Sequence, residues 1–368
     1  MVRVAIIGGG PHAAVIAQIL SKTLKKTSIA VALYSLGSGY VVLHRLYTDK
    51  RNLEVANGTY SHMRKLVGKA QLFKKTRIHY LVSDASMAYT VKRVEKTIWE
   101  PRKVGLRVVE GSTGSSFPIK MSTLAYIEGE AYIASAPKLT VALLKSLKRV
   151  ESLYSPRIGI ATKEGKVVGI DVGGTSYNFD YVIVDEGYIW MSMLRDHVPK
   201  HLPRTRTGCI DGFTPLGASL VVSDSLSGLW LDGRFTICLE AAGSASGAVG
   251  LLGSIAGALG DSIERGDLHL IQGLRVRETI LAPDKSPLVG SLEEGPSGLI
   301  AILGCYSDCL SLSSGIASTI SAILAGEAQV KVKGGGLAAA YDIDRLERRD
   351  LLREVLGFPG LCGGGPPR

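Results

Sequence analysis

Apolar and polar positions change their period at a run of glycines near the start of the chain. Residues 2–7 (VRVAII) form a short apolar run, which is typical of a buried strand. Beyond the glycines, apolar side chains recur at helical spacing, at Ala13, Ala14, Ile16, Ala17 and Leu20. This pattern predicts a strand over 2–7, a helix over 11–24 and a second strand over 29–34.

The glycines lie where the strand turns into the helix, at Gly8 and Gly10, with Ala13 completing the pattern G-x-G-x-x-A. The first glycine permits a tight turn, the second lets the backbone approach a pyrophosphate, and the small third residue lets helix and strand pack closely. The helix N-terminus, with Pro11 and His12 in its first turn, offers N–H groups to an anion. We therefore expect a dinucleotide-binding βαβ unit; the alternative is a merely glycine-rich β–α turn.

Further along, helical and strand-like periods alternate. A helical stripe at Leu139, Ala142, Leu143 and Leu147 precedes short strands over residues 157–187, with turns at Glu164-Gly165 and Gly173-Gly174, a pattern typical of hairpins. Residues 204–243 also resemble consecutive antiparallel strands. The remaining predicted elements are a small-residue helix (247–265), a strand (274–283), a strand–glycine–helix segment (298–327) and a flexible tail (351–368).

Charge and hydropathy exclude two classes of partner. The formal net charge is +10, but basic residues form no sustained basic helix and no aromatic-rich binding motif, so we expect a solvated basic face and no nucleic acid. Two apolar stretches, 241–260 and 298–326, are rich in Gly, Ala and Ser, and Asp308 interrupts the second. We expect buried helices there and no membrane span. Because the first strand begins at Val2, we expect no signal peptide.

The five cysteines are odd in number and scattered, so we expect no disulfide framework and a reducing, cytoplasmic setting. Cys305 and Cys309 are expected to be two buried structural thiols, with a flavin-coupled redox pair as the alternative. His197 and His201 have a metal-like spacing, but Pro199 lies between them and no other ligand is adjacent. We expect no metal site.

Six segments, in chain order, carry a resemblance to known motifs. They are residues 3–20, 128–148 (a G-x-x-x-P-x-x-L-x-x-A-L helix), 179–194 (D-x-V-V-x-A-x-G), 278–292 (T-P-D-x-x-P-x-I-G), 298–327 (a glycine loop and last helix) and 341–346 (F-x-x-x-R-F). Together they resemble the D-amino-acid oxidase-like flavoproteins, the group with glycine oxidase, sarcosine oxidase and archaeal dye-linked proline dehydrogenases. The resemblance implies an α/β fold, with a Rossmann-like FAD-binding domain and an inserted α+β substrate domain built on an antiparallel sheet.

Four departures from the family pattern surround the implied FAD. Tyr34 or Ser35 replaces the acid that binds the ribose at the end of the second strand, and a hydroxyl lacks the charge assistance of a carboxylate. The following Ser/Gly loop is reduced to residues 37–39. The pyrophosphate-facing turn reads Asp185-Glu186-Gly187, where two acids would weaken binding unless they point away or pair with a cation. The second glycine of the flavin-side loop is replaced by Cys309.

The resemblance also assigns site residues. FAD is implied as cofactor, with Gly8, Gly10, Pro11, His12 and Ala13 at the pyrophosphate, Tyr34 or Ser35 at the ribose, Ile158 and Gly187 at the adenosine half, and Gly304, Cys305, Tyr306 and Ser307 at the flavin ring. Arg277 is the implied clamp for a substrate carboxylate, and Tyr306 the implied residue at the pyrimidine edge.

Two functional hypotheses follow. The first is an FAD-dependent oxidoreductase that oxidises the C–N bond of a small amino or imino acid and passes electrons to an acceptor or a partner subunit. The second is a catalytically inactive, flavoprotein-like subunit with a binding or assembly role. An NAD(P)-dependent dehydrogenase fits less well, because the second strand ends without the acid or arginine that those cofactors use. The expected FAD-binding domain comprises residues 1–50, 127–200 and 272–350, and the substrate domain residues 51–126 and 201–271.

Overall fold

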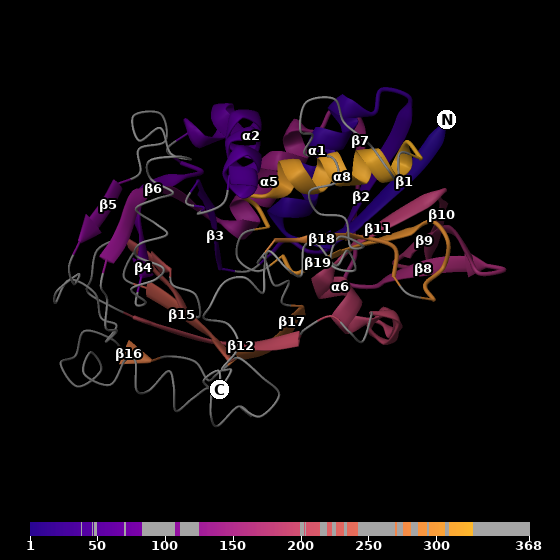
Figure 1. The fold of residues 1–368 in the computed structure, drawn as a ribbon. Coiled ribbons are helices and arrows are strands. Elements are labelled where there is room, and N and C mark those ends of the chain that lie inside the picture. Colours follow the sequence, from indigo (N-terminus) through magenta and orange to yellow (C-terminus); the bar gives the residue numbers. More distant parts are fainter. Residues whose placement is uncertain are drawn as a thin grey trace, which may run out of the picture.

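The computed structural model describes residues 1–37, 39–45, 47, 50–69, 71–82, 107–110, 125–198, 202, 204–213, 219–222, 226–231, 234–241, 269–270, 275–280, 286–292, 294–305 and 309–326. Within these residues the chain forms a six-stranded, a ten-stranded and a three-stranded sheet (Figure 1). The expected mixed α/β architecture is confirmed at this level. The predicted helix over 247–265 and the tail over 351–368 lie outside the described residues.

The six-stranded sheet has the order β18-β19-β11-β1-β2-β7. Its strands are β1 (Val2–Gly9), β2 (Thr27–Ser35), β7 (Val150–Tyr154), β11 (Tyr181–Asp185), β18 (Leu288–Gly290) and β19 (Leu299–Leu303). All neighbouring pairs are parallel except β18 with β19. The first two strands confirm the sequence prediction and extend it by one or two residues at their ends.

Both faces of this sheet are buried, which explains why its strands are nearly continuous apolar runs. On β1, the side chains of Val4 and Ile6 belong to one core cluster and those of Ala5 and Ile7 to another. The two clusters lie on opposite faces because successive side chains of a strand alternate in direction. Strand β1 is therefore held between two packed layers, and the glycine turn follows at its end.

Helices cover the face to which Val4 and Ile6 point (Figure 1). They are α1 (Pro11–Thr23), α2 (Lys50–Val67), α5 (Ala136–Ser146) and α8 (Ser313–Leu324). Helices α1 and α5 each have a proline in their first turn, where the missing N–H has no partner within the helix to lose. Helix α1 contacts both α5 and α8, so its N-terminus is fixed at the end of β1.

The opposite face is covered by the three-stranded sheet and by α6 (Glu186–Met191). This sheet has the order β10-β9-β8, with β8 (Ile158–Lys163), β9 (Lys166–Val172) and β10 (Thr175–Asn178). The two predicted hairpin turns are confirmed, since Glu164, Gly165, Gly173 and Gly174 all have positive φ, as type I′ turns require. A short 3₁₀ helix, η2 (Met193–His197), follows α6.

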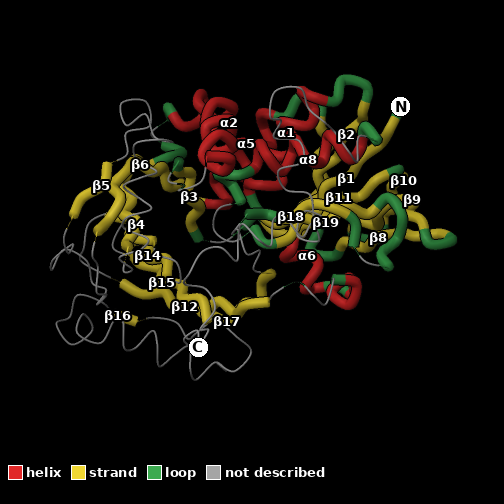
Figure 2. The backbone as a smooth tube through the Cα atoms, in the orientation of Figure 1, coloured by secondary structure: helices red, strands yellow, loops and turns green. Residues whose placement is uncertain are grey.

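The ten-stranded sheet forms a separate layer beside the six-stranded one (Figure 2). Its main path is β16-β12-β15-β14-β13-β4-β6-β3, and β17 and β5 pair with β12 and β6. The strands are β3 (Tyr40–His44), β4 (Lys74–Val82), β5 (Arg107–Glu110), β6 (Ala125–Ser135), β12 (Arg204–Phe213), β13 (Ser219–Val222), β14 (Leu226–Leu231), β15 (Arg234–Ala241), β16 (His269–Leu270) and β17 (Arg275–Ile280). Three strands of this sheet, β3, β17 and most of β6, lie within segments that were predicted to belong to the FAD-binding domain. The domain boundaries themselves stay a prediction.

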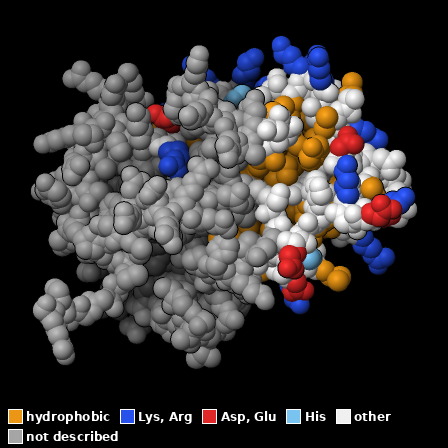
Figure 3. Space-filling view, turned by 45° about the vertical axis from the view of Figure 1, so that its right-hand side comes forward, with side chains coloured by type: hydrophobic (Ala, Val, Ile, Leu, Met, Phe, Trp, Pro, Cys, Tyr) orange, Lys and Arg blue, Asp and Glu red, His pale blue; other side chains and the backbone are white. Residues whose placement is uncertain are grey.

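The surface of the described part carries charges of both signs. Figure 3 shows Lys and Arg side chains spread over this face, with Asp and Glu side chains between them. Among the described helices, none combines the length and apolar character that a membrane crossing needs.

Candidate functional site

The glycine turn joins β1 to α1 with a backbone that few other residues would allow. Gly10 has φ of 100°, and a Cβ placed on it would lie 3.4 Å from the Cα of Gly37, whose own φ is 84°. The N–H of Gly10 donates to the carbonyl of Ser35 at 3.0 Å, and the N–H of Gly37 donates to the Ser35 hydroxyl at 3.0 Å. The turn after β1 and the turn after β2 are thus packed backbone to backbone.

Helix α1 begins directly after this turn without a side-chain cap from its N-cap residue Gly10. The N–H groups of a helix's first turn have no partner within the helix and favour an anion. Ala13 is buried beneath the turn, and a Cβ on Gly8 would lie 2.7 Å from the Cβ of Ala13. Gly8, Gly10, Pro11, His12 and Ala13 thus lie together at the end of β1, in the turn after it and in the first turn of α1.

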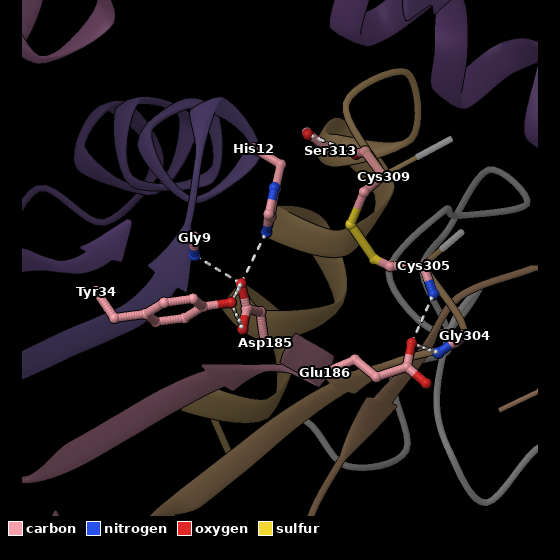
Figure 4. The surroundings of a disulfide bond; sticks show 9 residues. All are labelled: Gly9, His12, Tyr34, Asp185, Glu186, Gly304, Cys305, Cys309 and Ser313. Carbon is pink, nitrogen blue, oxygen red and sulfur yellow. Dashed lines mark hydrogen bonds and ion pairs between the residues drawn. A yellow bond between two sulfur atoms is a disulfide. The ribbon is translucent and has the colours of Figure 1, made fainter. Parts of the chain in front are cut away.

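A carboxylate of the chain itself also approaches this turn. Asp185 ends β11, which is the neighbour of β1, and its side chain reaches the inner side of the glycine turn (Figure 4). Its Oδ2 accepts a hydrogen bond from the N–H of Gly9 at 2.8 Å and lies 3.1 Å from Nε2 of His12. Its Oδ1 accepts from the hydroxyl of Tyr34 at 3.0 Å and from the N–H of Tyr188 at 2.8 Å. Asp185 is thereby also the N-cap of α6.

Asp185 is ionised at neutral pH despite its burial. Burial raises the pKa of this carboxyl group, but the hydrogen bond and charge of His12 and the N–H groups of Tyr188 and Gly9 lower it more, so the pKa lies below its ordinary value. The side chain is 8% exposed and that of His12 18%. The inner side of the turn therefore carries a buried negative charge with a histidine beside it.

Tyr34 fills the space beside two of the glycines. A Cβ on Gly9 would lie 2.7 Å from the ring of Tyr34, and a Cβ on Gly187 would collide with its hydroxyl. Tyr34 occupies the end of β2, where the resemblance implies an acid for the ribose. In this structure its hydroxyl donates to Asp185, and the hydroxyl of Ser35 accepts from Gly37.

Glu186 follows Asp185 in sequence but points to a different turn (Figure 4). It is 1% exposed, and its carboxylate accepts from the N–H of Ile280 at 2.7 Å, of Gly304 at 3.0 Å and of Cys305 at 3.4 Å. Nε1 of Trp190 also donates to it, at 3.2 Å. The two adjacent acids are thus divided between the turn after β1 and the turn after β19.

The turn after β19 contains Gly304, with φ of 64°, and a disulfide between Cys305 and Cys309. The expectation of two free structural thiols at these positions is therefore wrong. A second disulfide joins Cys209 on β12 to Cys238 on β15, which also corrects the expectation that the cysteines form no disulfides. The reason is tertiary: antiparallel pairing places Cys209 opposite Cys238, although 29 positions separate them.

The other predicted site residues are spread over several elements. The carbonyl of Ile158 accepts from the hydroxyl of Tyr188 at 2.9 Å, and Gly187 lies in the first turn of α6. The backbone of Arg277 pairs with Thr207 across β17 and β12, while its side chain is outside the described part. Tyr306 and Ser307 lie outside the described residues. In the part of the chain that the structure describes, no three His, Cys, Asp or Glu side chains gather as a metal site would require.

The sequence predicted that Asp185 and Glu186 would weaken diphosphate binding unless they point away or pair with a cation. In the structure Glu186 bonds to the turn after β19, whereas Asp185 reaches the turn after β1 and lies beside His12.

Gly9 and Tyr188, which also bond to Asp185, were not among the predicted site residues. The sequence does contain a hint for Gly9. The dinucleotide pattern requires glycine only at positions 8 and 10, so a glycine at position 9 needs a different explanation. A third glycine between them, together with a bulky Tyr34 at the end of β2, indicates that a side chain packs against the turn.

No family model matches the chain, and no curated protein matches it. Solved structures do. L-proline dehydrogenase from P. horikoshii superposes with a TM-score of 0.66 at 13% identity, over 95% of this chain and 98% of that one. Iminodiacetate oxidase from Chelativorans sp. BNC1 gives 0.62 at 17% identity over 92% and 98%, and glycine oxidase from Geobacillus kaustophilus gives 0.62 at 17% over 94% and 99%.

The chain has the fold of these enzymes. The resemblance to the D-amino-acid oxidase-like flavoproteins is confirmed at the level of the fold, and the low identities mark this chain as divergent.

Proposed function

We propose that the protein is an FAD-dependent oxidoreductase that oxidises the C–N bond of a small amino or imino acid. The observation that carries the proposal is the fold match over 92–95% of the chain with enzymes named for proline, iminodiacetate and glycine. Each of these compounds has a C–N bond next to a carboxylate. The match includes the ten-stranded sheet as well as the six-stranded sheet with its glycine turn, and this supports the reaction class.

The turn after β1 supports the cofactor assignment. Gly10 and Gly37, which both have positive φ, would let a diphosphate approach the backbone, and the first turn of α1 has no side-chain cap from Gly10. Gly8, Pro11, His12 and Ala13 would complete this part of the site, in a Rossmann-like domain assembled from residues 1–50, 127–200 and 272–350. Residues 51–126 and 201–271 would form the substrate domain.

The remaining roles are part of the same proposal. Tyr34 or Ser35 would contact the ribose, Ile158 and Gly187 the adenosine half, and Gly304, Cys305, Tyr306 and Ser307 the flavin ring. Bound FAD would supply the two-electron acceptor for the substrate carbon. The hydrogen bonds of Glu186 to Gly304 and Cys305 would keep the loop at the flavin ring in place.

Arg277 would bind and orient the substrate. A guanidinium binds a carboxylate through two parallel hydrogen bonds, which fixes the direction of the adjacent C–N bond. Tyr306 would close the site at the pyrimidine edge and exclude water. The electrons would leave through a soluble acceptor or a partner subunit, which the proposal does not specify further.

The location belongs to the proposal as well. We place the protein in the cytoplasm. The two disulfides do not fit the reducing setting from which this location was expected, because disulfides are rare in the cytoplasm except in the intracellular proteins of hyperthermophiles. A cytoplasmic location would therefore require a cytoplasm of that kind.

A second candidate function is a catalytically inactive, flavoprotein-like subunit with a binding or assembly role. The carboxylate of Asp185 on the N–H of Gly9 favours it, because a fixed negative charge opposes a diphosphate at the same turn. The use of the Tyr34 hydroxyl by Asp185 favours it too.

The visible absorption spectrum of the purified protein, before and after incubation with excess FAD, separates the two candidates. A flavin band that amino or imino acids bleach without oxygen would support the oxidoreductase. Arg277→Lys should then raise KM by about a hundredfold, whereas the exposed Arg157→Lys serves as the control and should not. A folded protein that takes up no FAD at any concentration would leave the inactive subunit as the function.

A further inference from the structure

Three side chains from three different elements meet on the inner side of the glycine turn. Asp185 comes from the end of β11, Tyr34 from β2 and His12 from the first turn of α1 (Figure 4). The sequence alone gives no reason for this meeting, since more than 150 residues separate Asp185 from the other two.

The hydrogen bonds of Asp185 leave it no capacity for a ligand. Oδ1 accepts from the Tyr34 hydroxyl and the Tyr188 N–H, and Oδ2 accepts from the Gly9 N–H with Nε2 of His12 at 3.1 Å. A carboxylate has about four lone-pair sites, and all four have partners here. Asp185 therefore cannot replace the missing ribose acid by binding a sugar hydroxyl.

Three glycines leave space for the side chains of Tyr34 and Asp185. Gly9 and Gly187 leave room for Tyr34, and a Cβ on Gly8 would lie 3.1 Å from Oδ2 of Asp185. Part of the glycine pattern thus accommodates the chain's own side chains and not only a ligand.

The charge of Asp185 lies at the end of α1 that favours anions. A carboxylate there gains the same stabilisation that the phosphate of a ligand would gain. Two negative groups at one helix end also repel each other, most strongly where water is excluded. The side chain of His12 lies next to Asp185, with Nε2 3.1 Å from Oδ2.

We propose that Asp185, held by Tyr34 and His12, is an internal anion that competes with the diphosphate of a dinucleotide for the turn between β1 and α1. The inference rests on the proposed function and deepens it: FAD would bind reversibly and exchange, instead of being retained as a tightly bound group. The chemical class that this device disfavours is the diphosphate, not the adenosine.

The test compares adenosine, ADP and FAD as ligands by isothermal titration calorimetry. In the unmodified protein, ADP should bind no more than a few-fold tighter than adenosine. Asp185→Asn removes the charge and keeps the shape, and it should tighten ADP and FAD binding by about tenfold or more, while adenosine changes by less than about twofold. Asp180→Asn is the matched control, because Asp180 precedes β11 at its other end and accepts from the N–H of Arg3; it should change none of the three.

Asp185→Ser is the second variant, because serine still caps α6 while the charge is lost. Like Asp185→Asn, this variant should bind ADP more tightly than the unmodified protein does. Circular dichroism checks that it is folded. The inference is overturned if ADP already binds the unmodified protein about a hundredfold tighter than adenosine, or if the two Asp185 variants bind ADP equally or more weakly. FAD that stays on the unmodified protein through gel filtration would overturn the inference and leave the proposed function standing. If neither the unmodified protein nor any variant binds ADP or FAD, both the inference and the proposed function are overturned.

Discussion

Two glycine turns follow parallel strands of the six-stranded sheet, and each is held by one of two adjacent carboxylates. Asp185 bonds to the turn after β1, and Glu186 bonds to the turn after β19. The hydrogen bonds described for the two carboxylates differ. Glu186 accepts from three main-chain N–H groups and the Trp190 indole, whereas Asp185 has the titratable side chains His12 and Tyr34 among its partners.

The comparison indicates that Glu186 stabilises the fold, and it is the basis of the proposal that Asp185 acts on ligand binding. The three N–H groups that Glu186 accepts from belong to the main chain, so we expect this carboxylate to hold its turn in place. The turn held by Asp185 lies at the start of α1, whose N-cap residue Gly10 supplies no side-chain cap, and Nε2 of His12 lies 3.1 Å from the carboxylate. The experiments below test this division of roles, from the largest expected effect to the smallest.

Removal of Glu186 should have the largest effect on stability. Glu186→Ala leaves the N–H groups of Ile280, Gly304 and Cys305 without their carboxylate in a buried place. Each unsatisfied buried donor costs about 1–3 kcal/mol, so we expect the free energy of unfolding in urea to fall by about 3 kcal/mol or more. Glu151→Ala, an exposed carboxylate on β7, is the control and should change it by less than about 0.5 kcal/mol. Equal losses in the two variants would contradict a structural role for Glu186.

Gly187→Ala should have an intermediate effect, because the new methyl group would collide with the Tyr34 hydroxyl. Overpacking of this kind costs about 1–3 kcal/mol, although alanine would otherwise stabilise a helix such as α6. Tyr34→Phe removes the hydroxyl and should restore part of the loss in the double variant. The double-mutant cycle of the two substitutions, followed by thermal unfolding, measures this coupling. Additive losses would show that Tyr34 does not pack against Gly187.

The smallest effect is a pH dependence of stability that belongs to Asp185. Its pKa is lowered from the ordinary value of 3.8 in the folded protein, so the folded state favours the charged form. The stabilisation is present above that value and is lost as the pH falls through the lower folded pKa. We expect the stability difference between the unmodified protein and Asp185→Asn to shrink below about pH 4 in urea titrations. If the stability difference between the two proteins stays constant below about pH 4, the charge of Asp185 does not contribute to the stability of the fold.

Much of the fold could be predicted because it depends on short stretches of sequence. Apolar runs and helical spacing predicted β1, α1 and β2 to within a few residues, and Gly165 and Gly174 marked two hairpin turns. No helix or strand is predicted between Ser35 and Tyr126, and the structure shows α2 there, together with strands that pair in the ten-stranded sheet. The pairing of β4 with β13 joins segments about 140 positions apart, which no local pattern encodes.

The sequence by itself determined the glycine turn, the helix behind it and the order of motifs that predicted the fold. Local backbone preferences and the periodicity of apolar residues act over a few positions, so these features can be recognised without knowledge of the rest of the chain. Only the tertiary structure decided that Asp185 and Tyr34 meet at Gly9 and that Cys209 faces Cys238. Those contacts follow from which strands are neighbours in a sheet, and strand order is set by the packing of the whole molecule.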